Sequence, residues 1–189
     1  MPQNQYLSGL AEAFKTAVLY DKDLYEIFKT QSEKIINRDE EVLKVIINKC
    51  VHAKSEIVEK DFTEQNIRAT LNLGHTFAHA LETTVGLGSV THGQAVAWGI
   101  GREIEVCVNK GYCLESFKKE IFSILEKFGW ETEPVPAVVR GGGVGERLLN
   151  AMHKDKKNID EKIRLVLTKN ICNVVVEEVE DSEILSVLK

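Results

Sequence analysis

Residues Arg68 to Gly93 form the most informative segment of the chain and read RATLNLGHTFAHALETTVGLGSVTHG. It holds three of the five histidines of the chain, His75, His79 and His92. The Ala, Leu and Thr content and the length of its first part predict a single helix from Arg68 through the HTFAH segment. At about 100° per residue, one stripe of this helix, about 60° wide, carries four polar side chains: Arg68, Asn72, His75 and His79. The opposite side is apolar, so the stripe is typical of the wall of a polar pocket.

The same stripe could instead be a solvated helix face, because histidine pairs four residues apart also occur on protein surfaces. A solvated face usually carries Glu and Lys, whereas here Arg68 and Asn72 stand in register with the two histidines. Gly74 within the predicted helix costs about 1 kcal/mol relative to alanine, and close approach of another group to the backbone would explain it. These observations favour the pocket.

His92 follows a predicted turn at residues 86–89 and precedes a second apolar helix, which we predict from Gln94 to Val108. The partial positive charge at a helix N-terminus disfavours protonated histidine at this position. A neutral imidazole is the form that binds a metal ion. The HTFAH pair and His92 would therefore suit zinc, with a carboxylate completing the ligand set.

Composition limits the classes of protein to which the chain can belong. Its 189 residues are 43% hydrophobic and 28% charged, as in an ordinary soluble domain with a real core. The net charge of −5 argues against a nucleic-acid partner and makes any cluster of Lys, Arg and His a local attractor for an anionic small molecule. Four cysteines without CxxC spacing fit a reducing cytoplasm. Neither a membrane-spanning run nor a signal-peptide pattern occurs.

The remaining periodicity predicts a mainly α fold, a multihelical domain with a small β-hairpin near the C-terminus. After an extended lead over residues 1–9, we expect helices at 10–19, 23–30, 39–58 and 114–128, one starting near Glu146, and a last one from Ser182. The helix at 39–58 should bury Val42, Val45, Ile46 and Cys50. The segments KIRLVLT and NVVVEEV should form the two strands of the hairpin.

Two further features have ordinary interpretations when taken alone. Glu12 and Lys15 lie three residues apart on the predicted first helix, which is the spacing of an intrahelical ion pair. Lys54, near the end of the long helix, has the sequence context of any surface lysine. The residues around them do not single out either feature.

The segments LNLGHTFAHALE and HGQAVAWG closely resemble the signature of the 3-dehydroquinate synthases, usually LNxGHTxGHAxE and HGEAVAxG. The likeness extends through Lys54 to GLAEAFK at residues 9–15 and DKK at 155–157. It covers essentially the whole chain, as the C-terminal half of that enzyme. The wider family of sugar-phosphate cyclases shares much of this pattern, and the iron- or zinc-dependent polyol dehydrogenases share the fold more loosely.

The resemblance implies a site with three groups of residues. A divalent metal ion, zinc or cobalt, would be bound by Glu12, His75 and His92. The substrate would be bound by Lys54, Arg68, Asn72, His79 and Lys156. The catalytic residues would be Lys15, Asn72 and His79, with His79 as a proton-transfer group.

The activity implied is the conversion of 3-deoxy-D-arabino-heptulosonate 7-phosphate, a small phosphorylated sugar acid, to 3-dehydroquinate and phosphate. This carbon–oxygen lyase reaction belongs to the shikimate pathway of aromatic amino acid biosynthesis. Enzymes of the family use NAD, bound by an N-terminal Rossmann-like domain. The resemblance further implies a homodimer in the full-length form, without a membrane or nucleic-acid partner.

Residues 1–189 would then be only the C-terminal metal- and substrate-binding domain. The glycine run at 141–145 does not supply an NAD site, because Glu146 and Leu148 stand where GxGxxG requires glycine. We therefore expect an excised domain or a truncated gene product, without the hydride acceptor and inactive alone.

The chain departs from the family pattern at Gln94, Ala78 and Thr16, where Glu, Gly and Tyr are usual. A Glu shortly after His92 would be a natural acceptor for its imidazole, so the uncharged Gln94 predicts a weaker metal site. Two other interpretations remain: a related cyclase or polyol dehydrogenase, and a non-catalytic metal-binding or dimerisation domain. Lys54, Arg68 and Lys156 together would suit a phosphorylated acid, which argues against the dehydrogenase. Titration with NAD would separate an enzyme of the family from a non-catalytic domain.

Overall fold

The computed structural model describes residues 1–60, 67–86, 88–154 and 162–189, with the side chains of residues 60, 67 and 68 outside that description. Helix α6 (His92–Asn109) is the central element, and most of its residues are buried. Helices α1 (Gln3–Tyr20), α5 (His75–Val85) and α7 (Glu115–Lys127) and strand β1 (Ile163–Asn170) all pack against it. Such an apolar helix is stable only when other elements cover it on all sides.

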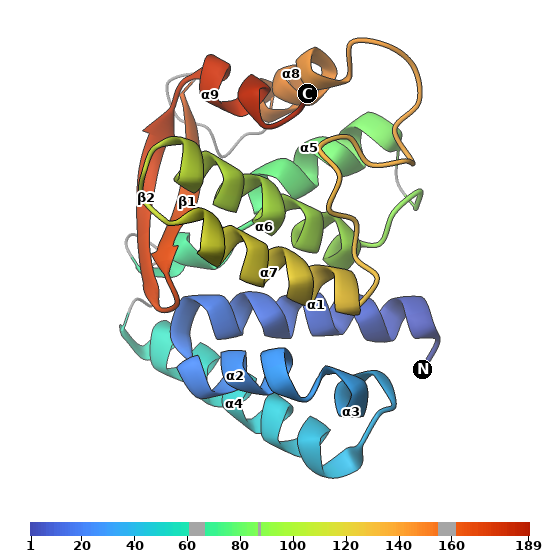
Figure 1. Ribbon diagram of the computed structural model, residues 1–189, viewed down its shortest axis with the longest axis vertical. Helices are drawn as coiled ribbons and strands as arrows, with labels where there is room; N and C mark the ends of the chain where they lie inside the picture. The colour runs from blue at the N-terminus through green and yellow to red at the C-terminus, as the bar shows by residue number, and fades with distance from the viewer. Residues whose placement is uncertain (61–66, 87, 155–161) are drawn as a thin grey trace.

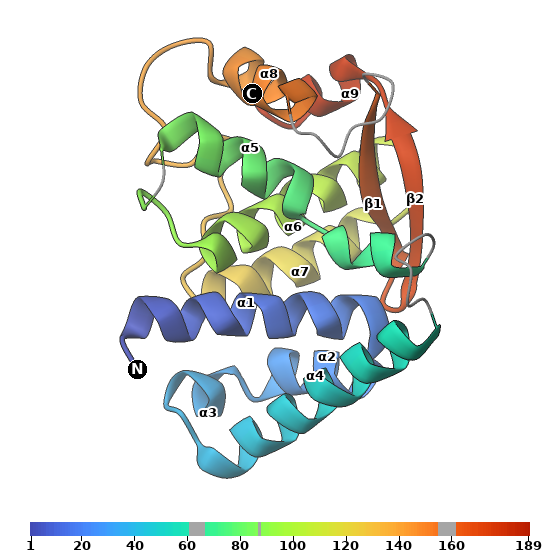
Figure 2. The same cartoon turned by 180° about the vertical axis from the view of Figure 1, so that it is seen from behind.

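Helix α1 divides the molecule into two parts (Figures 1 and 2). On one side lie α2 (Lys22–Thr30), α3 (Ser32–Ile36) and α4 (Glu40–Lys60). On the other lie α5 to α7, the hairpin, α8 (Val144–Lys154) and α9 (Asp181–Ser186). The 3-10 helix η1 (Ile67–Asn72) precedes α5 and contacts α1, α4 and both strands.

The predicted fold class is confirmed: the described chain is mainly helical, with one two-stranded sheet near its C-terminus. Strands β1 and β2 (Asn173–Val179) pair antiparallel from Ile163↔Val179 to Asn170↔Asn173. The buried side of β1 packs on α6. None of the described helices is long and apolar enough to cross a membrane.

The predicted single helix from Arg68 through HTFAH is wrong. The chain turns at Leu73 and Gly74 between η1 and α5, and Gly74 has a φ of 78°. A Cβ at Gly74 would lie 2.6 Å from the carbonyl oxygen of Val96, so the backbone of α6 closely approaches this turn. This confirms the expected reason for a glycine at this position, although the glycine ends one helix and begins another.

Three smaller expectations also fail. Residues 3–9 are helical rather than extended, because Tyr6 donates its hydroxyl proton to the Ile35 carbonyl and Arg38 lies over its ring. Val45 is 43% exposed, since only a narrow face of α4 packs on the core, where Ile46 is buried. The short helix α3 has no counterpart among the expected elements.

Arg102 ties α6 to the C-terminal end of the chain. Its side chain is fully buried and donates hydrogen bonds to the carbonyl oxygens of Val187 and Thr132. It also forms an ion pair with Glu105 at 2.7 Å. Arg102 thereby supplies hydrogen-bond donors to two backbone carbonyl groups, near residues 132 and 187, that lie far apart in the sequence.

Candidate metal centre

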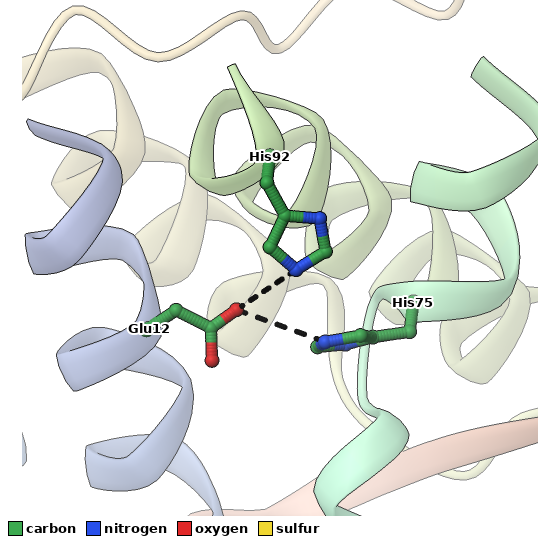
Figure 3. A group of neighbouring side chains, drawn as sticks. All are labelled: Glu12, His75 and His92. Carbon is green, nitrogen blue, oxygen red and sulfur yellow. Dashed lines mark ion pairs between the residues drawn. The ribbon is translucent and has the colours of Figure 1, made fainter. Parts of the chain in front are cut away.

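Three side chains from three helices meet at one point (Figure 3). Glu12 comes from α1, whereas His75 and His92 are the first residues of α5 and α6. The Oε1 atom of Glu12 lies 3.7 Å from Nε2 of His75 and 3.5 Å from Nε2 of His92. Their donor atoms all lie within 4.8 Å of one another, and His79 does not belong to this group found among the described residues.

Close contacts between backbones bring the three helices together. A Cβ at Gly93 would lie 2.1 Å from the carbonyl oxygen of Ser8, so α6 begins in direct contact with α1. The Gly93 amide also donates to the Ser8 hydroxyl at 2.9 Å. Because Gly93 follows His92, this contact places the imidazole of His92 beside Glu12, one helical turn beyond Ser8 on α1.

Each imidazole has a hydrogen-bond partner at its Nδ1 atom. Nδ1 of His75 lies 3.0 Å from the carbonyl oxygen of Leu73. Nδ1 of His92 lies 3.2 Å from Oε1 of Glu82, on α5. When Nδ1 carries the proton, the lone pair of Nε2 is free to bind a metal ion, and both Nε2 atoms face Glu12.

The charges at the site favour metal binding. Burial and then the Lys15 ammonium lower the pKa of His75 to about 4, so this imidazole is neutral at pH 7. Burial opposes ionisation of Glu12, but Lys15, 2.7 Å away, and the two histidines bring its pKa below the ordinary value. A carboxylate with two imidazoles, one of them held neutral, is a common ligand set for catalytic zinc.

The geometry also fits a metal ion. Two bonds of about 2.05 Å at a tetrahedral angle leave the ligand atoms about 3.3–3.4 Å apart, close to the two distances measured from Glu12. The Oε1 atom of Glu12 is buried and without a hydrogen-bond partner among the described residues. Buried polar atoms in proteins usually have a partner. A cation bound between Glu12, His75 and His92 would be a partner for this oxygen. The side chain of His92 is 45% exposed, so one side is open for a further ligand.

Lys15, predicted to be catalytic, and Lys54, predicted to bind the substrate, line one cavity. A cavity of about 670 Å³ lies between α1 and α4 and is lined by Glu12, Lys15, Lys54 and Leu71 together with apolar side chains of α4. Lys15 is only 6% exposed and points toward the metal-site carboxylate. The cavity therefore brings two cations close to the candidate metal ligands.

The other predicted residues differ in what the structure says of them. The ring of His79 lies 5.7 Å from that of His75 and 6.2 Å from that of His92, measured between centroids. Asn72 donates to the Ala69 carbonyl within η1. Lys156 and the side chain of Arg68 lie outside the described residues.

Gln94 caps the start of its own helix, and its predicted effect on metal affinity stays a prediction. Its side-chain oxygen accepts hydrogen bonds from the amide and hydroxyl of Thr91, in a capping box that begins α6. The carboxylate that contacts Nδ1 of His92 belongs to Glu82, which sequence reasoning missed. Its position seven residues after His75, two turns along the same helix face, was the available signal.

Comparisons with known proteins agree on the family. The model of the 3-dehydroquinate synthase C-terminal domain matches residues 9–158. The 3-dehydroquinate synthase of Thermoanaerobacter sp. (strain X514) is 35% identical over 189 residues, 100% of this chain and 51% of the relative. That of Pelobacter propionicus is 34% identical over 186 residues, 98% of this chain and 50% of the relative. The chain thus spans about half the length of the curated relatives it matches.

Solved structures share the fold at lower identity. One is ValA, a 2-epi-5-epi-valiolone synthase from Streptomyces hygroscopicus subsp. jinggangensis 5008 with NAD⁺ and Zn²⁺ bound, at 18% identity and a TM-score of 0.86 over 100% of this chain and 51% of that one. Another is a 2-deoxy-scyllo-inosose synthase complexed with carbaglucose-6-phosphate, NAD⁺ and Co²⁺, at 21% identity and a TM-score of 0.84 over 100% and 53%. On the sequence matches, this chain belongs to the 3-dehydroquinate synthase family and contains its C-terminal domain.

Proposed function

We propose that the chain is the metal- and substrate-binding part of a 3-dehydroquinate synthase acting on 3-deoxy-D-arabino-heptulosonate 7-phosphate. The observation that carries this proposal is the buried Oε1 of Glu12, which has no hydrogen-bond partner in the described part of the chain and faces His75 and His92 beside a cavity with two lysines. Four free cysteines support a reducing, cytoplasmic setting.

Glu12, His75 and His92 would bind a zinc or cobalt ion, which supplies Lewis-acid polarisation of a substrate hydroxyl and of the carbonyl formed from it. Lys15 and Lys54 would bind the anionic phosphate and carboxylate groups of the substrate from the cavity wall. Arg68 and Lys156 are proposed to add further charge, and Asn72 to orient the substrate. His79, next to both candidate imidazole ligands, would transfer a proton during loss of phosphate.

The hydride acceptor is proposed to be NAD on a Rossmann-like domain outside residues 1–189, in a homodimeric full-length enzyme. The residues described here then contribute positioning and charge. A ketone beside the departing phosphate makes the intervening C–H acidic, so the elimination needs little beyond well-placed cations and a proton acceptor.

We expect the pure 189-residue chain to bind one zinc or cobalt ion but to release no phosphate from the heptulosonate phosphate with NAD added. The physical reason is that the proposed metal ligands lie within residues 1–189, whereas the domain proposed to hold NAD lies outside them. Isothermal titration and a phosphate-release assay measure the two properties. Turnover by the chain alone would show that NAD binds within residues 1–189, contrary to the proposal. Absence of metal binding would contradict the proposed metal centre.

Lys54→Ala should weaken binding of the heptulosonate phosphate to the zinc-loaded chain about ten- to a hundredfold, because it removes a charge-assisted contact of about 1.5–3 kcal/mol. Lys44→Ala is the matched control, since Lys44 lies on the same helix, is exposed and pairs with Glu41. Titration calorimetry measures both affinities. Equal losses of affinity in the two variants would mean that general charge, rather than the cavity, attracts the ligand.

The same calorimetry tests the identity of the substrate. Binding of glucose 6-phosphate, which lacks the carboxylate, as tight as that of the heptulosonate phosphate would favour another cyclase activity.

A further inference from the structure

A buried carboxyl group lies behind the metal centre. Glu103 on α6 is completely buried, and its Oε2 accepts a hydrogen bond from the Gly74 amide at 2.8 Å. Its Oε1 has no hydrogen-bond partner among the described residues. Burial raises the pKa of Glu103 well above its ordinary value, which favours the neutral form of this carboxyl group.

The hydrogen bond from Gly74 connects Glu103 with His75. The Gly74 N–H and the Leu73 carbonyl belong to the same planar peptide unit. The N–H donates to Glu103, and the carbonyl oxygen lies 3.0 Å from Nδ1 of His75. A chain of two hydrogen bonds therefore runs from Glu103 through one peptide to the imidazole whose Nε2 faces Glu12.

This chain of hydrogen bonds can determine the ring orientation and the tautomer with which His75 binds a metal ion. A histidine that binds a metal usually donates its other ring N–H to a carboxylate or a carbonyl, which sets the tautomer and the ring orientation. Hydrogen bonds in series strengthen one another inside a protein. The acceptor for His75 is a carbonyl on a glycine turn with a φ of 78°, and the partner of the N–H in that peptide is Glu103.

We propose that Glu103 is a positioning residue of the metal centre: its carboxyl group fixes the Leu73–Gly74 peptide and, through it, the orientation and tautomer of His75. The proposal rests on the metal-binding function proposed above. The alternative is that Glu103 only satisfies a buried backbone N–H and supports the fold. The two roles can be distinguished, because with a purely structural role a substitution of Glu103 would change stability but not the orientation or tautomer of His75.

Two substitutions at Glu103 and one at Arg102 separate these roles. Glu103→Met removes the acceptor at similar volume, whereas Glu103→Gln keeps a neutral acceptor oxygen. Arg102→Met is the matched control, because Arg102 immediately precedes Glu103 on α6, is equally buried, and contacts the C-terminal end of the chain instead. The measurements are zinc affinity by competition with a chelator, the thermal midpoint, and the ring ¹⁵N shifts of His75 in the metal-free chain.

We expect Glu103→Met to weaken zinc binding about ten- to a hundredfold and to mix the tautomers of His75. Glu103→Gln should bind zinc within about threefold of the native chain, as a neutral acceptor should. Arg102→Met should lower the thermal midpoint but preserve both zinc affinity and tautomer.

The proposal is wrong if Glu103→Met keeps native zinc affinity and tautomer, if Glu103→Gln fails as badly as Glu103→Met, or if Arg102→Met loses as much affinity. Should Glu103→Met not fold, the native chain still decides, because a His75 protonated at Nε2 instead of Nδ1 contradicts the proposal. If the native chain binds no zinc or cobalt, the metal centre itself fails, and the His75 tautomer in the metal-free variants still tests the role of Glu103.

Discussion

Gly99→Ala is expected to lower the thermal midpoint of the chain by about 10 °C or more, from a loss of about 3–5 kcal/mol. A Cβ at Gly99 would lie 2.1 Å from the carbonyl oxygen of Gly74 and 2.9 Å from its carbonyl carbon. Both atoms belong to the backbone, so no side-chain rotation can relieve the clash, and α6 must move away from the start of α5. Thermal unfolding followed by circular dichroism measures the change.

The control is Gly101→Ala on the same helix. The atoms nearest to a Cβ at Gly101 would be side-chain atoms of Phe122 and Leu125, none nearer than 3.5 Å, which is ordinary contact. Alanine in a helix interior is more favourable than glycine by about 0.5–1 kcal/mol, so this variant should be as stable as the native chain or slightly more stable. Similar midpoints for the two variants would contradict the packing described for Gly99.

Glu12→Gln is expected to weaken zinc binding by a hundredfold or more, on the order of 3 kcal/mol. The substitution replaces the only charged ligand of the proposed set with a neutral amide, and even residues behind the ligands contribute about ten- to a hundredfold. It also leaves the Lys15 ammonium without its partner at 2.7 Å, so a smaller loss of stability, about 1 kcal/mol, should accompany it. Competition with a chromogenic chelator measures the zinc affinity.

His79→Ala is the matched comparison for ligand assignment. If the two histidines of HTFAH bound one ion together, as an imidazole pair four residues apart can, this variant would lose the metal. We expect its zinc affinity to stay within about threefold of the native value, because the donor atoms that converge belong to Glu12, His75 and His92. Loss of zinc in His79→Ala together with retention in Glu12→Gln would require a different ligand set.

Local pattern in the sequence was sufficient for the fold class. The helix and strand periods predicted the mainly helical chain and the C-terminal hairpin, because side-chain burial alternates with the geometry of each element. The resemblance in GLAEAFK, LNLGHTFAHALE and HGQAVAWG indicated the family and named Glu12, His75 and His92. The structure brings these three together, and their binding of a metal stays a prediction.

Periodicity failed where contacts between distant residues decide the backbone. The predicted helix through Gly74 ignored α6, whose Val96 carbonyl occupies the space of a Cβ at that glycine. The same limitation explains the N-terminal helix, which depends on Tyr6 contacting Ile35 and Arg38. These contacts join residues far apart in the sequence, so the local hydrophobic pattern does not indicate them.

Local pattern and family resemblance were therefore enough to predict the fold class, the family to which the chain belongs and the residues to be tested as ligands. The contacts that hold those ligands come from tertiary packing: Glu82 rather than Gln94 contacts His92, and Glu103 accepts a hydrogen bond from the turn before His75. The physical reason is that a local pattern reports whether a side chain is buried. Its hydrogen-bond partner is set by the packing of helices that meet only after the chain has folded.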